Sequence, residues 1–235
     1  MNLKKHFNPN IKIGITGWST GENSFGVTKP YLDFFSNFGV VEILTPQKGI
    51  RNDLNLVVLP GGADTYAKKY DLSPGFFNSN PDVVKEYFVD TNLDLYINNG
   101  TPVLGICLGL QQIAVKFGSK LTQHMYHPYS SPRSELVHKV LPPFTDENDQ
   151  YHITTDNCLV VVQRGKKDLE VNSLHHQAVR WDDLGQDLEI LLLDEDGEYV
   201  EALKHITLPI YGLQWHPEEI HDNYSINLIK KLLTK

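Results

Sequence analysis

The sequence predicts an α/β fold with a doubly wound, mostly parallel sheet. Short and continuously apolar runs, typical of strands buried on both faces of such a sheet, alternate with amphipathic stretches at helical spacing. This alternation of strands and helices favours a parallel sheet covered on both sides. After Lys120 the segments become shorter and more β-like, so we expect a small antiparallel β extension in the C-terminal half. No repeat or Gly/Ser-rich linker interrupts the chain, which predicts one domain over residues 1–235.

The first elements follow from apolar runs and the glycines that end them. Residues 11–16 predict a strand that runs into a glycine-rich loop over residues 17–26. Four aromatic residues at helical spacing predict a helix over residues 31–38, and Gly39 ends it. Residues 40–44 are predicted to form the second strand.

The next elements again alternate between strands and a helix. Residues 54–59 predict a third strand, and a long polar loop follows over residues 63–81. Residues 82–98 form an amphipathic pattern with Asp82 early in it, which favours one helix. The short apolar run 102–106 predicts a strand buried on both faces.

The C-terminal half is predicted to contain one helix and then mainly strands. Residues 110–117 are at helical spacing, and Gly118 stops that helix. The turn residues 194–197 predict that the strands on either side of them form a hairpin. The predicted strands of this half are residues 159–162, 188–193, 199–203 and 210–215.

Composition excludes several classes of protein. Twenty-nine acidic residues against 21 basic ones give a net charge of −8, which argues against a nucleic-acid partner because phosphate backbones need a basic face. Two cysteines cannot form a disulfide framework. No apolar run approaches the roughly 20 residues that cross a bilayer, and the N-terminus lacks the apolar region of a signal peptide. We therefore expect a cytoplasmic protein with no membrane partner.

Cys107 lies between a predicted strand and a predicted helix, in the sequence Gly105-Ile-Cys-Leu-Gly109. This is the pattern of a nucleophile elbow with cysteine in place of serine. The glycines allow another backbone segment to pass close by, and the helix N-terminus favours a thiolate. The alternative is a buried cysteine in a glycine-flanked turn. Cys158 has no such setting and is expected to be a packing residue.

A thiol nucleophile needs a base, and His216 is the candidate with the most suggestive surroundings. A predicted apolar strand ends at His216, Pro217 favours an extended backbone there, and Glu218 follows two residues later. In extended geometry residues i and i+2 point the same way, so Glu218 is predicted to orient the imidazole. The alternative is an exposed strand end with chance charges. Glu219 is expected to be a solvated neighbour.

Two glycines after the third predicted strand complete the constellation. In Leu-Pro-Gly-Gly, residues 59–62, the glycines leave backbone amides free to point into a cleft. The amides of Gly62 and Leu108 are therefore candidate donors for an oxyanion hole, and the alternative is an ordinary turn. The histidines lack the spacing of a zinc site, and Gly14 and Gly17 make no dinucleotide fingerprint, so we expect neither a metal nor a cofactor.

Three motifs taken together resemble the class I glutamine amidotransferase superfamily. They are Pro-Gly-Gly at 60–62, Gly-Ile-Cys-Leu-Gly-Leu-Gln at 105–111 and Gln-Trp-His-Pro-Glu at 214–218. The segment 171–179 is similar to the γ-glutamyl hydrolase branch, the peptidase C26-type enzymes that include γ-glutamyl-γ-aminobutyrate hydrolase. The resemblance extends from Ile11 to about Ile220 and implies a flavodoxin-like sheet.

The resemblance also implies a chemistry and a set of residues. It implies a catalytic triad of Cys107, His216 and Glu218 that cleaves a γ-glutamyl amide through a γ-glutamyl thioester. By position, Gln111 matches a residue that holds the glutamyl group. His176 and Gln177 match the segment that closes over its α-amino and α-carboxyl groups.

One departure from the family's pattern leaves the identity of the leaving amine undetermined. The branch that acts on γ-glutamyl-γ-aminobutyrate usually has arginine after the nucleophile, and this chain has Leu108. The loops 63–81 and 124–133, where specificity would be set, match no assignable pattern. Three hypotheses remain: a hydrolase of a small-molecule γ-glutamyl substrate, a glutaminase component that delivers ammonia to a separate synthase, and a non-catalytic binding protein. A synthase or a second copy of the chain is the expected protein partner.

Overall fold

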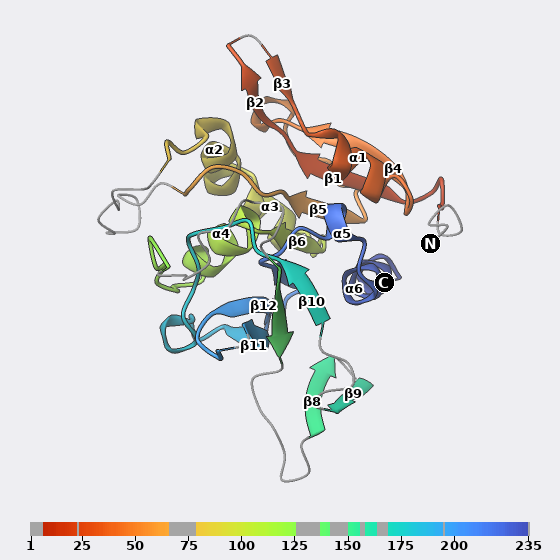
Figure 1. Ribbon diagram of the computed structural model, residues 1–235. Helices are drawn as coiled ribbons and strands as arrows, with labels where there is room; N and C mark the ends of the chain where they lie inside the picture. The colour runs from red at the N-terminus through yellow and green to blue at the C-terminus, as the bar shows by residue number, and fades with distance from the viewer. Residues whose placement is uncertain are drawn as a thin grey trace.

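The computed structural model contains a nine-stranded sheet in the order β10-β7-β11-β12-β13-β6-β5-β1-β4. Figure 1 shows the sheet with helices packed around it. For the strands between residues 137 and 163 the structure describes the backbone only. The described residues are 7–22, 24–65, 79–125, 137–141, 150–155, 158–163, 169–194 and 196–234.

One half of the sheet is parallel. Its strands lie side by side in the order β4-β1-β5-β6-β13. Numbered along the chain, this is the 2-1-3-4-5 order of a flavodoxin-like sheet, so the predicted fold class is confirmed. The strands are β1 (Lys12–Thr16), β4 (Val40–Leu44), β5 (Leu56–Leu59), β6 (Val103–Ile106) and β13 (Ile210–Leu213).

The other half of the sheet is antiparallel and contains the predicted hairpin. In that hairpin β11 (Leu188–Asp194) pairs with β12 (Val200–His205), and Gly197 in its turn has a φ of 73°. Beyond β11 the sheet continues through two strands that the sequence did not predict, β7 (Val137–Leu141) and β10 (Leu169–Asn172).

Among the described residues, two small hairpins lie outside this sheet. The predicted strand at 159–162 is β9 (Cys158–Gln163), whose partner among the described strands is β8 (Gln150–Thr155). The predicted glycine-rich loop contains a short hairpin of β2 (Trp18–Gly21) and β3 (Ser24–Gly26), which projects from the top of the molecule in Figure 1.

The helices cover both faces of the parallel half, which follows from the alternation of side chains along each strand. On β5, Val58 packs into the cluster that contains side chains of α1 and α6, whereas Val57 packs into the cluster of α2, α3 and α4. The helices are α1 (Lys29–Phe35), α2 (Val83–Thr91), α3 (Leu93–Asn98), α4 (Leu108–Lys116), α5 (Pro217–Ile220) and α6 (Asn223–Leu233), with 3₁₀ turns at Pro46–Lys48 and Trp181–Asp183.

One helical prediction needs correction, and one long helix was not predicted. The single helix expected over 82–98 is divided at Asn92, which ends α2 and begins α3. Helix α6 was not predicted, although Asp222 caps it by accepting a hydrogen bond from Ser225 N at 2.7 Å. Trp215 fixes α6 to the end of β13, since its indole N–H donates to Asp222 and Ser225.

Among the described helices, none combines the length and the apolar character required to cross a membrane.

Candidate active site

Cys107 occupies the turn between β6 and α4, at the carboxyl end of the parallel strands. Its φ of 51° and ψ of −106° place a non-glycine residue in a sparsely populated conformation. A methyl group on Gly109 would lie 2.0 Å from the carbonyl oxygen of Leu59, and one on Gly105 would lie 2.5 Å from the backbone of Gly109. The close backbone approach that explains the two glycines is therefore present.

His216 and Glu218 form a hydrogen-bonded pair beside this turn. His216 Nδ1 lies 2.7 Å from Glu218 Oε1, and Glu218 is only 4% exposed. The predicted reason for their proximity is wrong, because β13 ends at Leu213 and the pair does not lie in extended backbone. Instead His216 is the N-cap of α5, and Pro217 occupies the first helical position, which its fixed φ suits.

The electrostatics of His216 connect this pair to the cysteine. Burial alone lowers the pKa of an imidazole. Here the charge of Cys107, a hydrogen bond with it, and the Glu218 carboxylate outweigh burial and raise the pKa of His216 to about 10. Because Nδ1 faces Glu218, Nε2 is the ring nitrogen left for the thiol. The arrangement therefore favours a charged imidazolium beside Cys107.

Two residues that the sequence analysis did not assign to the site hold this constellation in place. The side-chain amide of Asn172 accepts from the backbone N–H of His216 at 2.8 Å and donates to its carbonyl at 3.4 Å. The hydroxyl of Tyr31 accepts from Gly61 N at 2.8 Å and lies 3.5 Å from His216 Nδ1. Tyr31 was predicted only as part of the aromatic face of α1, because nothing in the local pattern indicates a polar contact.

The candidate oxyanion donors belong to neighbouring residues, since a methyl group on Gly62 would lie 3.3 Å from the Leu108 side chain. Gly62 follows β5, and Leu108 is the first residue of α4, where the amide has no partner within the helix. Within the part of the chain that the structure describes, neither amide donates to a protein oxygen. The Gly61 amide is already used by Tyr31. The arrangement therefore leaves the two predicted donors available to a substrate oxygen.

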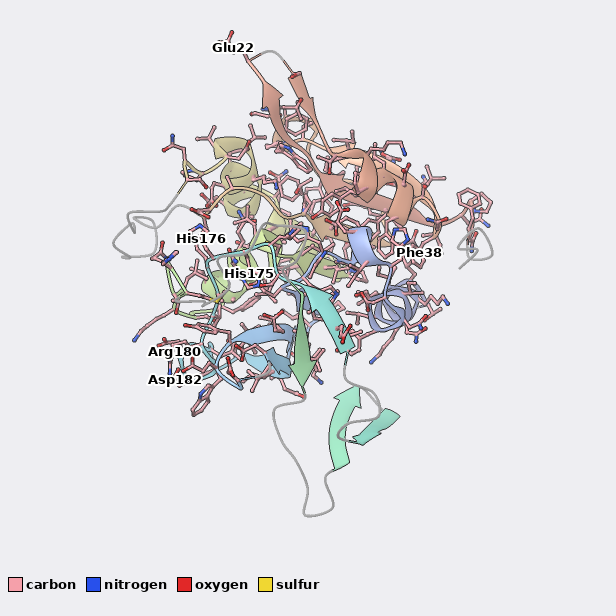
Figure 2. The ribbon with its side chains drawn as sticks, in the orientation of Figure 1. Glu22, Phe38, His175, His176, Arg180 and Asp182 are labelled. Atoms are coloured by element: carbon pink, nitrogen blue, oxygen red, sulfur yellow. The ribbon has the colours of Figure 1, made fainter. Side chains whose placement is uncertain are left out.

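A cavity of about 570 Å³ brings together residues from both halves of the sheet. Cys107, His216 and Gly62 line one side of it, and the predicted substrate-binding residues also line it. Those residues are Gln111, His176 and Gln177. Figure 2 shows His175 and His176 on the segment that follows β10, so the antiparallel half contributes a wall of the cavity.

Consecutive histidines on that wall have different partners. His176 Nε2 lies 3.0 Å from Asp64 Oδ1, so the pair links the loop after β5 to the segment after β10. His175 faces inward, with Nδ1 donating to the Gln177 carbonyl at 3.0 Å and Nε2 lying 3.7 Å from buried Glu201. Asp64 was not predicted as a site residue, although it follows the Pro-Gly-Gly motif closely.

Gln111 is fixed on the floor of the cavity. Its amide nitrogen donates to the Gln177 carbonyl at 2.8 Å and to Gln214 Oε1 at 3.3 Å. The Gln177 side chain donates to Gln123 at 2.9 Å. These contacts order a polar floor beneath the thiol before any substrate binds.

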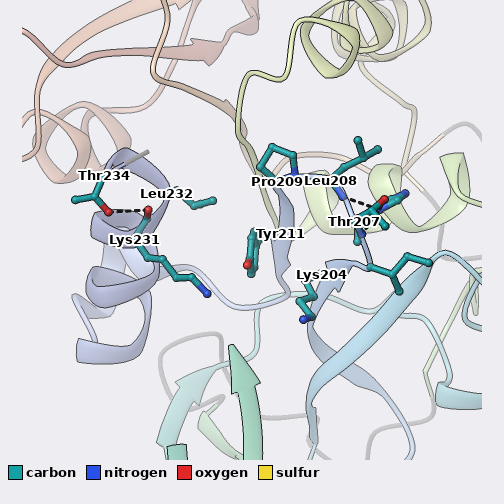
Figure 3. Close-up of a pocket in the computed structure, with 10 residues that line it drawn as sticks. Lys204, Thr207, Leu208, Pro209, Tyr211, Lys231, Leu232 and Thr234 are labelled. Atoms are coloured by element: carbon teal, nitrogen blue, oxygen red, sulfur yellow. Dashed lines mark hydrogen bonds between the residues drawn. The ribbon is translucent and has the colours of Figure 1, made fainter. Parts of the chain in front are cut away.

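A second cavity, of about 260 Å³, lies at the opposite end of β13 (Figure 3). Lys204, Tyr211 and Lys231 line it. None of the predicted site residues is found there. Of the two predicted specificity loops, residues 66–78 of the first and 126–133 of the second lie outside the described part of the chain, and so does the side chain of Cys158.

Comparison with solved structures places the fold among glutamine amidotransferases. A GMP synthase subunit of Thermoplasma acidophilum superposes with a TM-score of 0.60 and 21% identity, over 96% of this chain and 94% of that one. A glutamine amidotransferase of Thermotoga maritima superposes with a TM-score of 0.54 and 17% identity, over 95% and 86% of the two chains.

Proteins of similar sequence are also named as glutamine amidotransferase-like proteins or as glutamine-hydrolysing subunits. The glutamine amidotransferase-like protein YvdE of Lactococcus lactis is 31% identical over 80% of this chain and 78% of its own length. A glutamine-hydrolysing GMP synthase subunit of Thermococcus kodakarensis is 32% identical over 66% of this chain and 70% of its own. Residues 19–218 match the Peptidase C26 family, a range that contains the candidate nucleophile and both of its partners. The chain therefore belongs to the Peptidase C26 family.

Proposed function

We propose that the chain is a cysteine-dependent hydrolase of γ-glutamyl amides. Its family and relatives support an amide hydrolase of the glutamine amidotransferase type. The observation that carries the finer proposal is the placement of Cys107 at a strained strand-to-helix turn, on a cavity that it shares with His216, which is hydrogen-bonded to Glu218. A strained cysteine, a charged imidazole and an orienting carboxylate are the three parts of a nucleophilic triad.

The reaction divides into two halves. The Cys107 thiolate attacks the amide carbonyl carbon, and the amides of Gly62 and Leu108 donate to the resulting oxyanion. As the C–N bond breaks, His216 gives its proton to the leaving amine and a thioester remains on Cys107. His216 then takes a proton from water, whose oxygen attacks the thioester carbonyl. The tetrahedral intermediate then collapses: the C–S bond breaks, the free carboxylic acid leaves, and the Cys107 thiolate is left beside the imidazolium that His216 formed when it took the proton from water.

A second candidate function proceeds through the same thioester intermediate. Three relatives are glutamine-hydrolysing GMP synthase subunits, and that name describes one component of a synthase. In this alternative the chain hydrolyses glutamine and passes the ammonia to a separate synthase. The triad cannot distinguish the two functions, because they diverge only after the amine leaves.

The test is turnover by the purified chain without any partner. The substrates are glutamine and a panel of γ-glutamyl amines, and Cys107→Ala serves as the inactive control. Robust turnover of a γ-glutamyl amine supports the hydrolase. Slow hydrolysis of glutamine that becomes faster when a synthase is added supports the second function. Absence of Cys107-dependent amide hydrolysis under both conditions contradicts both.

A further inference from the structure

Lys85 is a buried lysine directly behind the candidate oxyanion loop. The sequence pattern predicts only that it belongs to an amphipathic helix, but in α2 it is 3% exposed. Its ammonium group donates to the carbonyl oxygen of Pro60 at 3.2 Å and to that of Gly61. The same group lies 4.4 Å from the centroid of the Trp18 ring. Because burying a lysine is costly, a site that satisfies it with two consecutive carbonyls requires an explanation.

The two carbonyls belong to the loop that supplies the oxyanion donor. In a trans peptide the C=O of one residue and the N–H of the next point in opposite directions, and no described peptide bond is cis. Since the Gly61 carbonyl points to Lys85, the Gly62 N–H points away from Lys85. Gly62 lines the cavity that contains Cys107, whereas Lys85 is not among the described residues that line it.

Both backbone polar groups of Gly61 in this loop are thus hydrogen-bonded. Tyr31 accepts from the Gly61 N–H, and Lys85 binds the Gly61 carbonyl. A rotation of the Gly61–Gly62 peptide would break the contact with Lys85 and turn the Gly62 N–H away from the cavity. We propose that Lys85 is a positioning residue that fixes the Gly61–Gly62 peptide so that its N–H faces the oxyanion formed at Cys107. This inference rests on the proposed function in one respect, since it takes Cys107 as the nucleophile.

The charges around Lys85 are compatible with this role. Burial lowers the pKa of Lys85 to about 8, against the opposing influence of Asp82, Cys107, Glu218 and Glu86. Near pH 7 the group is therefore mainly an ammonium, which makes stronger hydrogen bonds to carbonyls than a neutral amine does. It acts through the backbone of the loop, because its protons are directed at the two carbonyls.

The test compares two reactions of the same thiol. Acylation of Cys107 by p-nitrophenyl acetate passes through a tetrahedral oxyanion, whereas alkylation by iodoacetamide displaces iodide without one. For Lys85→Met we expect the acylation rate to fall on the order of 10- to 100-fold, less than the roughly 10²- to 10³-fold for outright loss of one oxyanion donor, because the Gly62 N–H is still present. The alkylation rate should stay within about twofold. Both rates are taken at the pH plateau, where the thiol is fully ionised, so that a change in its ionisation does not enter the comparison.

Two further variants make the result interpretable. Lys85→Arg retains the cation and should recover part of the acylation rate. Lys204→Met removes another buried lysine, one that pairs with Glu189 at 3.2 Å beside the second cavity, and should change neither rate. Circular dichroism and thermal melting confirm that each variant is folded.

Each outcome has a defined meaning. An equal fall of both rates in Lys85→Met, or no change in either, would overturn the positioning role. Absence of Cys107-dependent acylation in the wild-type chain would overturn both this role and the nucleophile. If the wild type is acylated by the ester but cleaves no γ-glutamyl amide, the proposed substrate fails and the ratio of the two rates still decides the role of Lys85.

Discussion

The parallel and antiparallel halves of the sheet contribute to the same cavity in different ways. The parallel half presents the candidate chemistry through backbone geometry: a positive φ at Cys107, a close approach at Gly109 and a free amide at Gly62. The antiparallel half presents side chains, such as His176 and Gln177, from the segment after β10. His216 follows β13, the strand that pairs in parallel with β6 and antiparallel with β12.

This difference leads to an expectation about substitutions. A change on the parallel side alters a geometry that the whole sheet determines, so it should remove turnover or destabilise the fold. A change on the antiparallel side alters a contact to the substrate, so it should mainly change affinity and selectivity. The following predictions test that division, from the largest effect to the smallest.

The largest effect is expected at the nucleophile. Cys107→Ala removes the attacking sulfur, so kcat for a γ-glutamyl amide should fall by roughly 10⁴-fold or more. Cys158→Ala, at the other cysteine of the chain, should retain turnover. Steady-state kinetics of the two variants make the comparison. Equal losses in both would contradict the assignment of Cys107.

The next effect is expected at the orienting carboxylate. Glu218→Gln keeps the shape of the side chain but removes the charge beside His216 Nδ1. We expect kcat to fall on the order of 10³- to 10⁴-fold with little change in KM, as for a triad that loses its acid. Full activity in this variant would mean that another group orients His216.

The pairing of His216 with Glu218 also predicts that the stability of the fold depends on pH. The pKa of His216 is raised to about 10, above its ordinary value near 6.5, so its charged form stabilises the fold. That contribution is complete below about pH 6.5 and is lost as the pH rises through 10. Melting curves of the wild type and Glu218→Gln should therefore differ most near pH 6.5 and converge toward pH 10. A difference that grows with pH would contradict this sign.

A smaller effect is expected from the close backbone approach. Gly109→Ala places a methyl group 2.0 Å from the Leu59 carbonyl oxygen, so either β5 or the turn that contains Cys107 must move. We expect this shift to lower the free energy of unfolding by about 3 kcal/mol. Gly26→Ala is the matched control, since its methyl group would meet nothing closer than 3.9 Å. Urea denaturation of both variants measures the difference. Equal stability would show that the turn tolerates a side chain.

The smallest effect is expected at the contact that links the two halves, where Asp64 after β5 pairs with His176 after β10, because this substitution alters only the hold on a side chain of the antiparallel half. Asp64→Asn keeps the size of the side chain that contacts His176 but weakens the pair by removing its charge. We expect a change of about tenfold in kcat/KM, mainly through KM, because a hydrogen bond to a charged group contributes roughly 1.5 kcal/mol. A large fall in kcat alone would instead place Asp64 with the catalytic groups.

Much of the parallel half could be predicted from the sequence, because its strands are continuous apolar runs and glycines mark their ends. The antiparallel half could not be predicted in full. Strand β10 has the sequence Leu-Glu-Val-Asn, too short and too polar to distinguish from a loop, and its pairing partner β7 is distant in the chain. Local signals for strands weaken when tertiary pairing decides the structure.

The candidate site likewise contains residues that the sequence predicts and residues that it does not. The sequence predicts Cys107, His216 and Glu218 as a triad because the proposed nucleophile lies in a local motif and its proposed partners are two residues apart. Lys85 was missed because a lysine in an amphipathic helix is ordinarily exposed, and only the position of α2 against β5 and Trp18 buries it. Contacts made between distant segments carry no signal in a single sequence.

The most direct test of the central claim is to trap the covalent intermediate. The wild-type chain is mixed with a γ-glutamyl amide, quenched in acid within the first turnover, digested and analysed by mass spectrometry. The proposal predicts a glutamyl thioester on the peptide that contains Cys107, and its absence in Cys107→Ala. An adduct on the peptide that contains Cys158, or turnover without any adduct on Cys107, would contradict it.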